Sequence, residues 1–372
     1  MPRPQILSLP ERLDADPRYA GRGVCIGVID SGFYPHPDLM RPRRRVRAYA
    51  DVAREIPVAS EFFTPQPWSW HGTMTACCAA GNGYVSGGRY RGLASEADVV
   101  LIKAGIDDGR IRGKNVASAI RFPLRYPHLE VRILNVSLGV LRSDPDYDDV
   151  EAAVSEVVAK GITVFAAAGN APGKLPLAPG SGRDAITAGG ANDKNNTNAS
   201  DDEPWSSTSY GVTAPGVSKP DLLAPAIWLP APMLPGTLLA REAAALFQLV
   251  SVLEEASAEH GFSETRQTAT PEERASVQAL IEAVGMRMNR CKYISPDYQH
   301  VDGTSFAAPI TASVAAQMLE ANPALTPTLL REGLTKTAVP LPNVERERQG
   351  AGMLRPRLAV DWALKQRAES AR

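Results

Sequence analysis

The sequence predicts an α/β fold in which helices cover both faces of a parallel β-sheet. Short, almost continuously apolar runs alternate with helical patterns, which is typical of strands buried on both faces. Residues 148–161 predict one such helix, because Val150, Val154 and Val157 or Val158 recur at helical spacing before Gly161. The predicted strands are residues 24–30 (VCIGVID), 97–104 (ADVVLIKA), 131–139 (VRILNVSLG) and 161–170 (GITVFAAAGN).

A change of pattern between residues 227 and 299 predicts a helical hairpin inserted into this α/β body. Its first helix carries an apolar stripe and is closed by Gly261, and its second opens with a capping box at Thr270–Glu273. The stripe consists of Leu239, Ala243, Leu246, Val250 and Leu253. We therefore divide the chain into an N-terminal extension (1–19), a body (20–226 and 300–345), the insertion (227–299) and a C-terminal helical tail (346–372).

Composition excludes several classes of partner. The 372 residues contain 40 Lys and Arg against 41 Asp and Glu, so no global charge directs the chain to nucleic acid or to an anionic membrane. The run RPRRRVR (41–47) has five arginines without interleaved aromatic residues, and we expect a solvated loop there. The apolar runs are shorter than the roughly 18 residues of a membrane span. We expect no nucleic-acid partner and no membrane association.

The cellular compartment is predicted from the N-terminus and the cysteines. Residues 1–23 lack the apolar stretch of a signal peptide, and the four cysteines show neither a disulfide framework nor a metal-ligand spacing. Free thiols in a reducing compartment, and hence a cytoplasmic location, are the expectation. A chain trimmed from a longer precursor would instead be secreted.

Chemistry-bearing residues follow the predicted strands. Asp30-Ser31-Gly32, Ser137-Leu138-Gly139 and Gly169-Asn170 each stand at the end of an apolar run, and ligands of open parallel sheets bind beyond the carboxyl ends of strands. These three strand ends are expected to converge on one site.

A serine at the start of a helix supplies a candidate nucleophile. In the stretch VDGTSFAAP (301–309), Gly303 allows a tight turn and Pro309 is tolerated only near a helix start, so Ser305 falls in the first turn. A helix N-terminus favours an oxygen that becomes negative during a reaction. The hydroxyl needs a general base and a group that orients the base, and His71 and Asp30 supply these residue types. Each of the three residues alone has an ordinary structural explanation.

Six ordered blocks resemble the signature blocks of the subtilisin-like serine peptidases, or subtilases. The blocks are GVIDSG with the downstream HPDL, then HGTMTA, NVSLG, AAAGN, SKPDLLAPA and DGTSFAAP, and they cover roughly residues 20–226 and 300–340. The resemblance implies that Ser305 is the nucleophile, His71 the general base and then acid, and Asp30 the residue that holds the imidazole. It makes Asn170 the oxyanion-hole amide. Substrate would be a polypeptide lying as an added strand along Ser137, Leu138, Gly139, Ala168 and Gly169, and the reaction would need no cofactor and no metal.

The sequence departs from the family pattern at several places. Met74 stands where a second histidine is usual, and Ile310 replaces the histidine expected after Pro309. Leu177 and Ala178 predict a shallow or apolar specificity pocket, and residues 81–92 lack the carboxylates of a calcium loop. The insertion precedes Ser305 directly, so we expect a lid, a docking surface for a regulatory partner protein, or a platform that restricts substrates. Residues 4–13 could lie across the cleft as a regulatory arm or pack on the surface.

Two readings of the function stay open. The first is a serine endopeptidase that works through an acyl-enzyme at Ser305 and is regulated by the insertion or the N-terminal arm. The second is a non-catalytic or latent scaffold on the same fold that binds a partner through the helical insertion. Sedolisin-type serine-carboxyl peptidases share a similar serine block but are disfavoured, because they use a glutamate where His71 stands.

Overall fold

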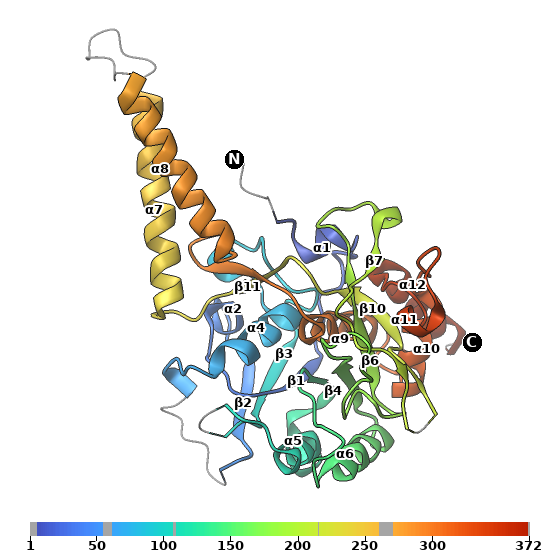
Figure 1. Ribbon diagram of the computed structural model, residues 1–372. Coiled ribbons are helices and arrows are strands. Elements are labelled where there is room, and N and C mark those ends of the chain that lie inside the picture. The colour runs from blue at the N-terminus through green and yellow to red at the C-terminus, as the bar shows by residue number, and fades with distance from the viewer. Residues whose placement is uncertain (1–5, 55–61, 107–108, 215, 260–270, 371–372) are drawn as a thin grey trace.

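A mostly parallel sheet forms the centre of the computed structural model, which describes residues 6–54, 62–106, 109–214, 216–259 and 271–370 (Figure 1). The order of strands across the sheet is β10-β6-β5-β4-β1-β3-β2, and every neighbouring pair along this path is parallel. A short strand, β7, pairs antiparallel with β6. The strands are β1 Cys25–Asp30, β2 Val46–Asp51, β3 Asp98–Lys103, β4 Val131–Val136, β5 Thr163–Ala167, β6 Ile186–Asn192, β7 Glu203–Pro204 and β10 Leu222–Pro225.

Helices cover both faces of the sheet, which confirms the predicted α/β class. On one face, α4 (Ser69–Ala80) and α9 (Thr304–Ala321) pack against each other, and α9 runs along β4, β5, β6 and β10. On the other face lie α5 (Gly113–Arg125) and α6 (Tyr147–Ala159), seen at the bottom of Figure 1. Strand β1 serves both layers, since Ile26 and Val28 belong to the α4/α9 core while Cys25 and Ile29 belong to the α5/α6 core.

Strand β1 ends at Asp30 as predicted, but two of the predicted strands end earlier than their apolar runs suggest. Strand β4 stops at Val136 and β5 at Ala167, so Ser137-Leu138-Gly139 and Ala168-Gly169-Asn170 lie in the loops that follow. This is the edge at which a ligand of a parallel sheet binds. The remaining helices are α1 Leu9–Arg12, α2 Pro37–Met40, α10 Pro327–Thr337, α11 Arg346–Gln349 and α12 Pro356–Ser370, with short 3-10 turns at Tyr84–Ser86, Pro127–Leu129 and Ala199–Asp201.

The helical hairpin stands away from the body in Figure 1, drawn in yellow and orange. Its helices are α7 (Leu238–Glu259) and α8 (Pro271–Arg290). The predicted helix stop at Gly261 and the cap at Thr270 lie outside the described residues. The hairpin grows from an antiparallel ribbon of β11 (Leu229–Pro232) and β12 (Tyr298–Val301), and β11 packs on α4. A second small ribbon joins β8 (Gly211–Val212) and β9 (Ser218–Lys219).

Both ends of the described chain pack into the body. Leu9 and Leu13 from the N-terminal extension and Ala359, Val360 and Ala363 from the C-terminal helical tail are buried in the same core as α9. Arg12 forms a buried ion pair with Asp193 and also donates to the carbonyls of Ile227 and Trp228. The described residues of the N-terminal arm are therefore held by buried contacts.

The arginine run is not simply a solvated loop. Arg45 is 4% exposed, and its guanidinium donates to the backbone carbonyls of Ala80, Ala97 and Asp38. Arg43 and Arg47 lie at the surface and pair with Asp98. The expectation was wrong at Arg45 because three buried carbonyls converge there and need donors. In the described part of the chain, every helix falls short of the length or the apolar character that crossing a bilayer requires.

Candidate active site

Asp30 and His71 form a hydrogen-bonded pair at the carboxyl end of β1. His71 Nδ1 lies 2.9 Å from both carboxylate oxygens of Asp30. The Asp30 side chain is fully buried, whereas the His71 side chain is 22% exposed. The proton on Nδ1 therefore makes a hydrogen bond to the carboxylate, and the other ring nitrogen, Nε2, is left to accept a proton from another group.

The local chain geometry forces these two residues together. Asp30 ends β1 and His71 is the third residue of α4, directly followed by Gly72. A Cβ added to Gly72 would lie 2.3 Å from the backbone oxygen of Gly32 and 2.8 Å from Asp30 Cβ. Helix α4 can approach the strand end this closely only because residue 72 has no side chain.

Two neighbours complete the surroundings of the buried carboxylate. The Ser31 amide donates to Asp30 Oδ1 at 2.7 Å, and the Thr75 hydroxyl lies 3.2 Å from Oδ2. These bonds satisfy the carboxylate lone pairs that His71 does not use, as a buried charge requires. Ser31 was predicted to lie at this strand end but was given no role, and Thr75 was not singled out from the sequence, although it stands four positions after His71 and so lies on the same helix face.

The pKa of His71 is set by two opposed effects. Burial lowers the pKa, since it disfavours the charged imidazolium. The negative charge of Asp30 and its hydrogen bond raise the pKa and outweigh burial, so the net shift is upward from the ordinary value of 6.5. The pair is therefore suited to holding an imidazolium during proton transfer.

Ser305 is the second residue of α9, beside this pair. Helix α9 has Gly303 as its N-cap and no side-chain cap, so its first amides point out of the helix. Phe306 follows Ser305, and its ring lies 5.9 Å from the His71 ring between centroids. Among the described residues, the structure records no hydrogen bond between the Ser305 hydroxyl and His71. Such bonds are often long without substrate and tighten when it binds.

Pro309 and Ser137 together fix the backbone of Ser305. In an α-helix the carbonyl of residue 305 would accept from the amide of residue 309, but proline has no N–H. The Ser137 hydroxyl fills this place and donates to the Ser305 carbonyl at 2.7 Å. Asn135 Nδ2 in turn donates to the Ser137 oxygen at 3.0 Å. The predicted cleft residue Ser137 is thus a buried anchor for the first turn of α9.

Asn170 lies against the same helix start. Its Oδ1 accepts from the Thr304 amide at 2.9 Å and from the Thr304 hydroxyl at 2.8 Å. Because a backbone N–H can only donate, the oxygen of the Asn170 amide must face Thr304 and the NH₂ group must face away. The amide is exposed, and Nδ2 lies on the Gly303 side, where an added Cβ would sit 3.4 Å from it.

The predicted cleft residues line the loops around Ser305. Gly169 has a φ of +103° and donates its amide to the Thr304 hydroxyl at 3.0 Å, next to buried Ala168. Gly139 is exposed and Leu138 is half-buried. Leu177 packs over Gly139, since a Cβ there would lie 2.9 Å from Leu177 Cδ1. Thr304, which links Gly169 and Asn170 to α9, was not identified from the sequence, though it directly precedes Ser305.

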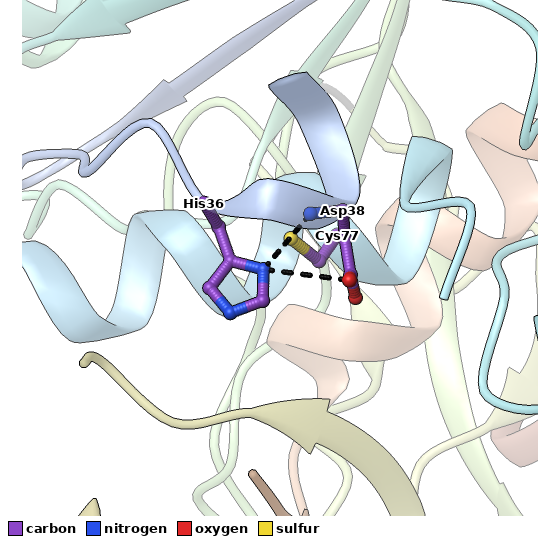
Figure 2. Close-up of side chains that lie close together, drawn as sticks. All are labelled: His36, Asp38 and Cys77. Carbon is purple, nitrogen blue, oxygen red and sulfur yellow. Dashed lines mark hydrogen bonds and ion pairs between the residues drawn. The ribbon is translucent and has the colours of Figure 1, made fainter. Parts of the chain in front are cut away.

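A buried cluster of His36, Asp38 and Cys77 places ligand atoms within 4.8 Å of one another, so we tested it as a metal site (Figure 2). Its polar atoms already have protein partners. The Asp38 carboxylate accepts from the Tyr298 hydroxyl and from the Val85 amide, and His36 Nδ1 accepts from the Asp38 amide. Burial raises the pKa of the Cys77 thiol well above its usual value, which opposes the thiolate a metal prefers. The residues fit a structural anchor better than a metal centre.

The chain resembles known proteins over most of its length. The family model described as "Subtilase family" matches residues 21–352. The chain is 29% identical over 337 residues to "Serine protease AprX" of Bacillus subtilis (strain 168), which covers 87% of this chain and 64% of that protein. It is 30% identical over 187 residues to "Subtilisin-like protease 3" of Pseudogymnoascus destructans, covering 48% of this chain and 41% of that protein.

A third relative is "Intracellular serine protease" of Paenibacillus polymyxa, 32% identical over 155 residues that cover 40% of this chain and 42% of that protein. In each case the match spans less than two thirds of the relative's own length. The family match, in contrast, extends over nearly the whole body and the insertion, and it confirms the resemblance carried by the six sequence blocks. The chain belongs to the subtilase family.

Proposed function

We propose that the protein is a serine endopeptidase that hydrolyses polypeptides through an acyl-enzyme on Ser305. The observation that carries the proposal is the Asp30–His71 pair, whose imidazole ring lies 5.9 Å, between centroids, from the ring of Phe306, the residue that follows Ser305 at the start of α9. Membership of the subtilase family and relatives named as serine proteases support the same reaction class.

In the proposed reaction, His71 accepts the Ser305 hydroxyl proton as the hydroxyl oxygen attacks the scissile carbonyl carbon. The carbonyl oxygen becomes negative and is stabilised by the Asn170 Nδ2 group and the Ser305 amide at the start of α9. His71 then gives its proton to the leaving amine, and Asp30 holds the imidazole throughout. Water attacks the acyl-enzyme with His71 again acting as base, which releases the second product.

A fluorophosphonate probe tests this proposal without a known substrate, because it labels an activated serine. Probe on Ser305, located by peptide mapping, is expected in the wild type and absent in Ser305→Ala and His71→Ala. Hydrolysis of a denatured protein should fall at least about 10⁴-fold in Ser305→Ala; the loss measured for subtilisin, a member of this family, is about 2 × 10⁶ in kcat. Ser313→Ala is the matched control, since Ser313 is buried further along α9. Full hydrolysis by folded Ser305→Ala would refute the proposal.

We further propose that the helical insertion regulates access of substrate. Its root, β11, packs on α4, the helix that carries His71, so a displacement of the hairpin would shift residues next to the proposed general base. Replacing residues 237–290 by a short Gly/Ser link should change the range of cleaved proteins while leaving probe labelling of Ser305 intact. A folded deletion variant that cleaves the same substrates at the same rate would show that the insertion has no such role.

We place the protein in a reducing compartment such as the cytoplasm. All four cysteines are free, and three of them are buried. A relative named as an intracellular serine protease is consistent with this location. Fractionation of cells that produce the protein, with activity measured in each fraction, tests it.

A further inference from the structure

A deep pocket lies between α4 and the root of the helical insertion. It has a volume of about 770 Å³, within the range that holds a large side chain or a small molecule. From α4 it is lined by Trp70 and Met74, and from the insertion root by Met233, Leu234, Leu238 and Leu239. Two segments far apart in the sequence therefore build one apolar wall each.

Large apolar side chains gather at this pocket and stay exposed. Trp70 is 46% exposed, Leu238 81% and Leu239 50%. Met233 and Leu234 are buried beneath them. A cluster of exposed apolar groups around a concave site is typical of a binding surface, because each group is left in water until something covers it.

The pocket begins next to the candidate active site. Trp70 is the residue before His71, and the two rings lie 5.3 Å apart between centroids in an edge-on contact. The loops 137–139 and 168–170 flank Ser305 on the sheet edge, whereas the pocket is lined by Trp70, the neighbour of His71 on α4, and by the insertion root. Since His71 would protonate the leaving amine, chain that continues past it toward Trp70 is the part of the substrate after the cut.

Both α4 and the insertion make this pocket apolar. Met74, which stands where relatives usually have a histidine, faces the ribbon, and Gln299 Nε2 contacts its sulfur at 3.9 Å. Arg241 is the single charged residue among those that line the pocket, and its guanidinium donates to the Gly236 carbonyl at 2.8 Å. The pocket is thus an apolar hollow with a positive rim.

We propose that this pocket binds a large apolar side chain of the polypeptide substrate, carried two to four residues after the cleaved bond and followed by an acidic residue. At a rise of about 3.4 Å per residue in an extended chain, the 5.3 Å between the Trp70 and His71 rings corresponds to one to two residues beyond the first residue after the cut, and the wall at Leu238 and Leu239 extends the pocket to the next residue. The insertion would thereby select substrates through its root as well as through its projecting helices. This inference deepens the endopeptidase proposal and rests on it for the identity of the occupant.

A binding measurement tests the pocket separately from catalysis. Ser305→Ala protein is titrated into each of two fluorescent peptides, and anisotropy gives the affinity for each. Both peptides consist of Gly, Ser and Thr around one dipeptide, which is Phe-Glu in the first peptide and Ser-Glu in the second. We expect about tenfold tighter binding of the Phe peptide, as burial of one such side chain implies. Leu238→Ser combined with Leu239→Ser should remove the difference. Val252→Ser should keep it, because Val252 is 55% exposed on the same helix but far along it from the pocket.

The same variants are then compared in digestion of denatured casein with intact Ser305. Wild type and Val252→Ser should show cleavage sites enriched in large apolar residues two to four positions after the cut, and the Leu238/Leu239 double variant should lose this enrichment. Equal affinities for the two peptides, or a preference that survives the double variant, would overturn the pocket proposal. Absence of fluorophosphonate labelling at Ser305 would instead count against the endopeptidase proposal, and the anisotropy result would still decide whether the pocket binds apolar side chains.

Discussion

The candidate active site and the helical hairpin are stabilised in opposite ways. At the site, fully buried Asp30 is bonded to His71, Ser31 and Thr75, and helices α4 and α9 pack over β1, β3, β4, β5, β6 and β10. In the hairpin, six buried residues form the whole described core, and all of them come from its lower half or its root. Those residues are Met233, Ala243, Val250, Val284, Met288 and Tyr293. The side chains of the proposed catalytic site are therefore held by many contacts, whereas the hairpin, which is proposed to select substrates, is held by few.

Loss of the buried carboxylate charge should have the largest effect. Asp30→Asn keeps the size of the side chain but removes the charge that orients the imidazole and stabilises its protonated form. We expect kcat to fall about 10⁴-fold, the loss seen when the aspartate of a trypsin-like triad is changed in the same way. Asp98→Asn, at the surface start of β3, is the control and should keep full activity. Near-normal turnover by folded Asp30→Asn would show that the pair is only structural.

Removal of the exposed Asn170 amide should have the next largest effect on turnover. Asn170→Ala is expected to lower kcat about 10²–10³-fold, the magnitude known for this donor in subtilisin, a member of the same family. Asn170→Asp separates two roles, because it keeps the oxygen that accepts from Thr304 but has no N–H to donate. If Asn170→Asp restored activity, the role of Asn170 would be to hold α9 and not to stabilise an oxyanion.

The pH dependence of kcat/KM also depends on the Asp30–His71 pair, and the expected effect is smaller. His71 accepts a proton only when neutral, and its pKa is raised above 6.5, so kcat/KM should rise with pH through a midpoint above 6.5. In Asp30→Asn the charge that raises the pKa is gone while burial remains, so the midpoint of the residual activity should move below that of the wild type. Identical midpoints in the two proteins would mean that another group controls the acid limb.

The hairpin should tolerate damage that the body does not. Met288 is 2% exposed in the hairpin core, and Ile133 is fully buried in strand β4. Ile133→Ala should lower the main unfolding temperature, at a cost of roughly 2–5 kcal/mol. Met288→Ala should speed hydrogen exchange in α7 and α8. It should leave the main unfolding temperature and the rate of hydrolysis of a small ester unchanged. An equal fall in the main unfolding temperature of both variants would contradict the view that the hairpin is held less firmly than the body.

The sequence predicts most of the body and the residues of the site, since apolar runs and glycine-flanked motifs are local signals. The strand that contains Asp30 was found with its end at the right residue. The strands that precede Ser137 and Asn170 were found with their ends a few residues too late, because small residues such as Gly139 and Ala168 continue the apolar pattern after pairing stops. The positions of Asp30, His71, Ser305 and Asn170 agree with one shared site, while their catalytic roles stay predictions.

Contacts between segments that are far apart in the sequence could not be predicted. No local pattern announces that the Ser137 hydroxyl replaces the amide missing at Pro309, or that Thr304 joins Gly169 to Asn170. Burial of Arg45 was missed because its partners are backbone carbonyls, which every residue has. The pocket at Trp70 was missed for a related reason: its second wall is contributed by Leu238 and Leu239, whose exposure depends on how the insertion root docks on α4.

The bonds that Ser137 and Asn170 make to residues 304 and 305 also bear on when the protein becomes active during its synthesis. Asp30, His71, Ser137 and Asn170 leave the ribosome well before the nucleophile does, and the insertion must follow before Ser305 appears. A nascent chain that has made the strands from β1 to β6 still lacks Ser305. Under the endopeptidase proposal, hydrolysis would require α9 to be in place against β4, β5 and β6, so the order of the chain would protect the growing protein, and its neighbours on the ribosome, from premature cleavage.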